Sequence, residues 1–168
     1  MKDVFKKIWK AIDRFFSKKK NRRLVYIIII FFLALGNFLY SGLARRTFVF
    51  YSHIGDNIVV EDRMLHWSSD REANVRRYVE EALLGPKSPG AILLFHREAS
   101  LITLMLREGV VYVNLSETAV LPFQGSRDLF RSVLTLNEGI KRNFSYVNDV
   151  RIFIGGNEAF YEDFRRIF

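Results

Sequence analysis

Residues 24–43 read LVYIIIIFFLALGNFLYSGL, an apolar stretch without a single charged residue. A helix rises 1.5 Å per residue, so about 20 apolar residues match the roughly 30 Å hydrocarbon core of a bilayer. Tyr26 and Tyr40 lie near the two ends, where amphipathic rings prefer the membrane interface. The stretch therefore predicts a transmembrane helix over 24–43 rather than the buried core helix of a large soluble protein.

The residues before this stretch carry the whole net charge of +8. Residues 1–23 hold ten Lys or Arg and two Asp, whereas the basic and acidic groups of the remaining chain balance. Positive charge is retained on the cytoplasmic side, so we expect the N-terminus in the cytoplasm and everything after about residue 46 outside. The sequence thus predicts a single-pass protein of the cytoplasmic (inner) membrane. Because the outer part is neutral, we expect no nucleic-acid partner.

The leader, residues 1–23, has its own pattern. Apolar residues recur at helical spacing between lysines, which predicts a basic amphipathic helix lying on anionic membrane lipids. The residues expected to contact the membrane surface are Lys6, Lys7, Trp9, Lys10, Lys18, Lys19, Lys20, Arg22 and Arg23. Two alternatives are a docking peptide for a cytoplasmic partner and a charged anchor that only sets the topology.

A cleavable signal peptide is the competing interpretation of the N-terminal part. Gly42-Leu43-Ala44 resembles a small-x-small cleavage site, with cleavage after Ala44. The basic region and the apolar run are both longer than in secretory signal peptides, which favours an uncleaved signal anchor. The chain has no cysteine, which excludes a disulfide framework, a thiolate nucleophile and a cysteine-linked lipid anchor.

The remaining sequence predicts an extracytoplasmic α+β domain over 47–157. The expected elements are strands 47–52 and 58–67, a helix capped by Ser69 and Glu72 and ended by Gly85-Pro86, strands 101–107 and 110–116 around Glu108-Gly109, a helix opened by Ser126 and Asp128, and a strand 149–154 ended by Gly155-Gly156. This order predicts a small two-layer α/β sandwich with both helices on one face of a sheet. The tail 158–168 is expected to be amphipathic, either capping the core or forming a contact surface.

Four segments in this order resemble the GerMN domain family, which is named from a sporulation and spore-germination protein. They are Ala82-Leu83-Leu84-Gly85-Pro86, Val111-Tyr112-Val113-Asn114-Leu115-Ser116, Val133-Leu134-Thr135-Leu136 and Val150-Arg151-Ile152-Phe153-Ile154-Gly155-Gly156. The resemblance covers about residues 58–157. It departs at Asn114, where the family usually has Asp. It also departs between Gly85 and Leu101, a segment that lacks the proline and threonine residues typical of the family.

The resemblance implies a fold similar to ring-building motifs and a role in assembly rather than chemistry. Its motif residues, expected to be structural, are Leu84, Gly85, Pro86, Asn114, Leu115, Ser116, Thr135, Leu136 and Gly155.

A search for catalytic patterns yields no assembled site. His53, His66 and His96 are scattered without metal-ligand spacing, and no serine-nucleophile motif or phosphate-binding glycine loop is present. Glu61 and Asp62 are adjacent in a predicted strand and therefore point to opposite faces. We expect no enzyme activity, cofactor, metal or small-molecule substrate.

The sequence therefore favours a membrane-anchored scaffold or assembly subunit of a bacterial envelope complex. Its partner would be another copy of itself, in a ring or other oligomer, or another envelope protein. A second hypothesis is a module that binds an envelope ligand such as peptidoglycan, using Trp67, Tyr78, Tyr112 and His96. A hydrolase without a recognisable motif is a third.

Overall fold

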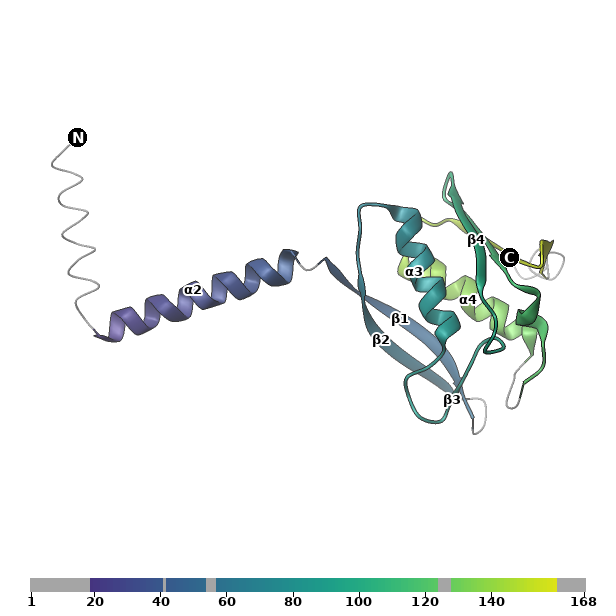
Figure 1. Cartoon of the computed structure of the whole chain (residues 1–168), viewed down its shortest axis with the longest axis horizontal. Helices are drawn as coiled ribbons and strands as arrows, with labels where there is room; N and C mark the ends of the chain where they lie inside the picture. The colour runs from purple at the N-terminus through teal and green to yellow at the C-terminus, as the bar shows by residue number, and fades with distance from the viewer. Residues whose placement is uncertain (1–18, 41, 54–56, 124–127, 160–168) are drawn as a thin grey trace. The chain divides into compact units, whose positions relative to one another are not determined.

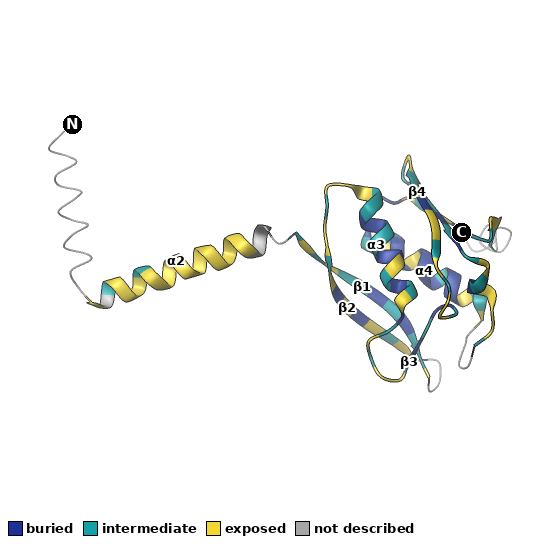
Figure 2. Cartoon of the chain, viewed as in Figure 1, coloured by how far each residue is buried: buried dark blue, intermediate teal, exposed yellow. Residues whose placement is uncertain are grey.

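A computed structural model describes residues 19–40, 42–53, 57–123 and 128–159 (Figure 1). The chain divides into two compact units, 1–42 and 43–168. In the first unit, helix α2 (Lys19–Tyr40) exposes nearly all of its apolar side chains from Leu24 to Leu35 (Figure 2). Among the residues described, no helix meets both the length and the hydropathy needed to cross a membrane. The predicted amphipathic helix before Lys19 lies outside the described residues.

The second unit contains two sheets, so the expectation of one sheet with helices on one face is wrong. The first has the order β2 (Ile58–His66), β1 (Leu43–Ser52), β3 (Ala91–Ile92), and the second has β4 (Leu101–Arg107), β5 (Val110–Leu115), β6 (Asp149–Ile154), β7 (Asn157–Glu158). The β1–β2 and β4–β5 pairs therefore belong to two separate sheets and do not pair with each other. The free edge of β1 pairs instead with β3, a two-residue strand in a segment predicted to be a loop.

The four predicted strands 47–52, 58–67, 101–107 and 110–116 are confirmed, and they pair as two antiparallel hairpins. β1 and β2 pair antiparallel from Leu43↔His66 to Tyr51↔Ile58, with β1 beginning four residues earlier than predicted. β4 and β5 turn at Glu108 and Gly109, which both have positive φ, as a two-residue hairpin turn requires. β5 and β6 are parallel, which requires a crossover connection, and this consists of the short 3₁₀ helix η1 (Glu117–Val120) and helix α4 (Leu129–Asn143).

The start of helix α3 (Arg71–Leu84) differs from the prediction. Asp70, not Ser69, is the N-cap, because its carboxylate accepts the N–H groups of Glu72 and Ala73. The Glu72 carboxylate accepts the N–H of Leu106 on β4 at 2.9 Å, so it ties the helix to the sheet. α4 begins at the predicted Asp128, which accepts the N–H of Phe130, whereas Ser126 lies outside the described residues. The tail after Gly155-Gly156 opens with β7 rather than a helix, and residues 160–168 lie outside the described part.

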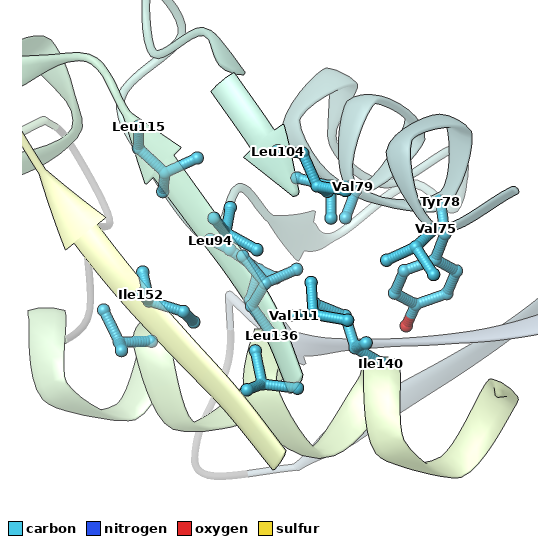
Figure 3. Packing of buried hydrophobic residues seen from close by; sticks show 14 of the residues in the cluster. Val75, Tyr78, Val79, Leu94, Leu104, Val111, Leu115, Leu136, Ile140 and Ile152 are labelled. Atoms are coloured by element: carbon cyan, nitrogen blue, oxygen red, sulfur yellow. The ribbon is translucent and has the colours of Figure 1, made fainter. Parts of the chain in front are cut away.

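One hydrophobic core joins the two sheets because α3 and α4 each contact both of them. Val75 and Val79 of α3 and Leu136 and Ile140 of α4 face the strands across it (Figure 3). Tyr78 stacks on Phe48 of β1 with ring centroids 4.5 Å apart and meets Phe144 edge-on. The aromatic contacts thus join α3, β1 and the end of α4.

The edge of β1 that does not face β2 is closed by a side chain of α4. Asn143 donates to the carbonyl of Thr47 at 2.7 Å and accepts the Thr47 N–H at 2.9 Å. A carboxamide has the same donor and acceptor as a peptide group, so it can replace a neighbouring strand. This contact fixes the C-terminal end of α4 against the first sheet.

The close approach of the two helices at Gly139 gives a testable prediction. A Cβ at this position would overlap the buried hydroxyl of Tyr78. We expect Gly139→Ala to lower the free energy of unfolding by about 1–3 kcal/mol, despite the better helix propensity of alanine. Tyr78→Phe removes the overlapping atom, so the double variant should lose less stability than the sum of the two single variants. Urea unfolding followed by circular dichroism measures the difference, and strictly additive effects would contradict the overlap.

Candidate interaction groove

A buried ion pair lies on the inner face of β2. The side chains of Glu61 and Arg63 are 7% and 3% exposed, and Arg63 Nη2 donates to Glu61 Oε2 at 2.6 Å. The guanidinium also lies over the rings of Phe48 and Phe50, 4.8 and 5.4 Å from their centroids. Glu61 therefore faces the core while Asp62 faces solvent, as strand alternation predicted.

The Arg63 side chain holds the C-terminal end of α3. It donates to the carbonyl and carboxylate of Glu81 at 3.1 and 3.2 Å, and to the carbonyl of Gly85 at 2.7 Å. The last carbonyls of a helix lack partners within the helix and carry partial negative charge, so a cation stabilises them. Gly85 ends the helix with φ of 89°, and a Cβ there would overlap Leu93.

Glu61 fixes the segment that follows the helix. Its carboxylate accepts the N–H groups of Lys87 at 3.0 Å and Ser88 at 2.7 Å. Burial opposes ionisation of Glu61, but the hydrogen bonds from Arg63, Ser88 and Lys87 outweigh it and lower its pKa to about 2. Glu61 is therefore ionised at neutral pH and has no proton to donate, so the pair acts as a structural clamp on residues 81–88.

A second set of hydrogen bonds holds the segment that leads into β4. Ser116 donates its N–H to the carbonyl of Ser100 at 2.9 Å and accepts the Ser100 N–H on its hydroxyl at 3.0 Å. Thr118 donates to the carbonyl of Glu98 at 3.0 Å. The end of β5 and the start of η1 thus position residues 98–101.

These two fixed segments form the walls of a surface groove of about 630 Å³. Leu83 and Leu84 at the end of α3 and Leu101 at the start of β4 give it an apolar surface. The full set of lining residues is Glu80, Leu83, Leu84, Arg97, Ala99, Ser100 and Leu101. The Leu84 side chain is 76% exposed, which is unusual for a leucine at the end of an otherwise packed helix.

The residues of the GerMN-like motifs lie in three places: the core, the turns and the groove. Leu115 and Leu136 are core residues, and Thr135 is buried with its hydroxyl 2.8 Å from that of Tyr51. Asn114 accepts the N–H of Gly156 at 3.1 Å, which holds the turn at Gly155. Leu84, Gly85 and Pro86 form or follow the first wall, and Ser116 supports the second.

The sequence motifs therefore include residues of the first wall and one residue, Ser116, that supports the second wall, but they did not show that the two walls face each other. Arg63, the residue that positions the first wall, was not predicted. In the sequence, Arg63 is distinguished only as a charged residue at an inward-facing position of a strand, on the opposite face from Asp62.

The predicted membrane-surface residues lie mostly outside the described part. Lys19, Lys20, Arg22 and Arg23 fall within the first turns of α2, and Lys19, Arg22 and Arg23 are exposed. Lys6, Lys7, Trp9, Lys10 and Lys18 are not among the described residues.

The four side chains suggested for an envelope ligand do not form one site. Tyr78 is buried in the core, Trp67 lies beneath Arg46, and His96 packs against Phe123. Residues 19–40, 42–53, 57–123 and 128–159 contain no group of three or more His, Cys, Asp or Glu placed to hold a metal ion.

No family model and no curated protein matches the chain. Among solved structures it is similar to the first GerMN domain of the sporulation protein GerM from Bacillus subtilis. That alignment has a TM-score of 0.52 and 14% identity, and covers 70% of this chain and 86% of the other. The tandem GerMN domains of the same protein align with a TM-score of 0.51 and 14% identity, covering 70% of this chain and 41% of theirs. The GerMN-like fold predicted from the sequence is thereby confirmed.

The Glu61 clamp predicts a specific pH dependence of stability. The pKa of Glu61 is about 2 in the folded domain against an ordinary value of 4.5, so its contribution is complete above 4.5 and is lost as the pH falls towards 2. We expect Glu61→Gln to lower stability at neutral pH and to flatten the acid limb of the stability profile. Urea unfolding of residues 43–168 across this range measures both. Asp62→Asn, on the exposed face of the same strand, should change the slope much less, and equal slopes for wild type and Glu61→Gln would contradict the clamp.

Proposed function

We propose that this chain, whose outer domain has the GerMN fold, is a non-enzymatic, membrane-anchored subunit of a bacterial cell-envelope assembly. Its domain acts through protein–protein contacts. The observation that carries this proposal is the groove between Leu84 and the Arg97–Leu101 segment. Fixed walls, an apolar lining and a charged residue on each side are the features of a surface that binds another protein.

The membrane anchor is the first part of the proposal. α2 is 22 residues long, and its apolar side chains from Leu24 to Leu35 are nearly all exposed (Figure 2). Exposed apolar surface of this extent is unfavourable in water and favourable in lipid. The basic leader before it supports an orientation with the N-terminus in the cytoplasm and the GerMN-like domain outside.

The partner is the second part of the proposal. The groove has Glu80 on the helix wall and Arg97 on the opposite wall, so a partner surface with one charge of each sign around an apolar side chain would complement it. Another copy of this chain or a second envelope protein could present such a surface. The solved GerMN domains belong to a sporulation protein, which supports a role in the bacterial envelope.

The anchor is tested by placing charge in the middle of α2. Ile29 and Phe32 are exposed, and each lysine placed at the bilayer centre costs about 3 kcal/mol. We expect Ile29→Lys with Phe32→Lys to move the protein from the membrane pellet to the supernatant after alkaline carbonate extraction. The matched variant, Ile29→Leu with Phe32→Leu, should remain in the pellet. If wild-type protein is itself released by carbonate, the anchor is wrong.

The groove is tested by changing its most exposed apolar residue. Light scattering of the detergent-extracted full-length protein should show a discrete oligomer if the partner is another copy. Leu84→Glu should lower the measured mass, because it places a charge in the apolar contact without disturbing the core. Val120→Glu, at an exposed apolar position on η1 outside the groove, is the control and should not change the mass. A wild-type monomer would contradict self-assembly, and equal masses for both variants would exclude the groove as the contact.

A further inference from the structure

The open end of the β1–β2 hairpin carries a second exposed apolar surface. Leu43 pairs with His66 and Arg45 with Met64, so these four side chains share the outer face of the first sheet. Leu43 and Met64 are 47% and 50% exposed, and Trp67, which directly follows β2, is 39% exposed. Trp67 lies at the same end of the hairpin but on its other side, where the Arg46 guanidinium contacts both Trp67 and Phe144. We call Leu43, Met64 and Trp67 the hairpin-base cluster.

Arginines surround this cluster. Arg46 lies over the Trp67 ring at 4.9 Å from its centroid, and Arg77 donates to the carbonyl of His66 at 2.9 Å. The Arg45 side chain is 72% exposed and pairs with Asp62. An exposed tryptophan, two exposed aliphatic side chains and several guanidinium groups at one end of a hairpin form a combination that favours the boundary between lipid headgroups and acyl chains.

Chain connectivity places this cluster close to the end of the proposed anchor. α2 ends at Tyr40 and β1 begins at Leu43, so only two residues separate them. Three peptide units span at most about 11 Å. If α2 crosses the membrane, Leu43 is therefore within about 11 Å of the point where the chain leaves the bilayer, whatever the orientation of the domain.

We propose that the hairpin-base cluster inserts into the outer-leaflet interface of the membrane and holds the domain against the lipid surface. This inference rests on the membrane anchoring proposed above. A protein partner on this cluster is the competing occupant. The lipid surface is favoured because, with α2 in the membrane, the two-residue connection limits the distance of Leu43 from the bilayer, so insertion requires little additional ordering.

Insertion of this cluster also determines which part of the domain a partner can reach. α3 begins at Arg71, four residues after Trp67, and its 14 residues extend about 20 Å to Leu84. The groove therefore lies a helix length from the hairpin base within the same domain. A domain attached to lipid by its base would leave the groove free for a partner.

Depth-dependent fluorescence quenching tests the insertion. The chain has two tryptophans, Trp9 and Trp67, so Trp9→Phe leaves Trp67 as the sole reporter in the full-length protein. The protein is reconstituted into vesicles of phosphatidylcholine and phosphatidylglycerol, with bromine on the acyl chains either near the headgroups or at the bilayer centre. We expect strong quenching of Trp67 by the shallow bromines and weak quenching by the deep ones.

Two variants in the same Trp9→Phe background make the result decisive. Trp67→Phe combined with Leu84→Trp moves the reporter to the groove, where the shallow bromines should quench it little. Leu43→Ser with Met64→Ser removes the two aliphatic side chains of the cluster and should abolish most of the quenching of Trp67, with unchanged circular dichroism showing that the domain remains folded. Strong and equal quenching at positions 67 and 84 would show that contact is not specific to the hairpin base, and would overturn the inference.

Vesicle flotation separates failure of this inference from failure of the anchor. Protein that floats with the vesicles but shows no quenching of Trp67 would overturn the insertion and leave the anchor intact. Protein that does not float would refute the anchor on which the inference depends.

Discussion

The buried guanidinium of Arg63 is the interaction on which the arrangement of the GerMN-like domain depends. It lies between the aromatic rings of β1 and the end of α3, and it joins the Glu61 carboxylate to the carbonyls of Glu81 and Gly85. Removing one partner of such a buried pair leaves an unpaired charge in a low-dielectric interior, which destabilises strongly. The cluster therefore specifies the position of α3 against the first sheet more than it adds net stability.

This clamp also explains why an apolar groove exists on the surface. A helix that ended freely could turn Leu84 inward or fray, because terminal turns are weakly held. Here the last carbonyls are bound by Arg63, and the following N–H groups of Lys87 and Ser88 are bound by Glu61. Leu84 is held outward opposite the Arg97–Leu101 segment, which the hydroxyl groups of Ser116 and Thr118 position independently. Binding to a preformed groove avoids part of the entropy lost on ordering an interface.

The domain exposes apolar side chains in two separate places, one for each of the two proposals: the groove for a protein partner and the hairpin base for lipid. Leu84 lies at the groove, whereas Leu43, Met64 and Trp67 lie at the base of the first hairpin. The inner faces of the same strands and helices bury Phe48, Val75 and Val79 almost completely. Well-packed elements that still expose leucine, methionine and tryptophan are typical of surfaces that contact another molecule. Lipid bound at the hairpin base, near the start of α3, and a protein bound at the groove, near its end, would cover both apolar surfaces.

Local chemistry in the sequence determined most of the elements of the GerMN-like domain. The β-rich runs around Glu108-Gly109, the Asp128 cap and the Gly85-Pro86 stop each act over a few residues, and each lies where it was predicted. The GerMN-like order of these elements was likewise recognised from short motifs. The N-cap of α3 was predicted one residue early, because Ser69 and Asp70 are both good caps and only the folded geometry selects between them.

Tertiary structure decided what depends on residues far apart in the chain. The separation into two sheets follows from pairing of β1 with Ala91–Ile92 and from Asn143 closing the same edge, and no local pattern encodes either contact. The groove requires Leu84 and Leu101 to meet, and the clamp requires Arg63 to reach Gly85. Hydrophobic periodicity and caps specify which segments form helices and strands, whereas the partners of a buried charge or of a free strand edge are settled only when the whole chain packs.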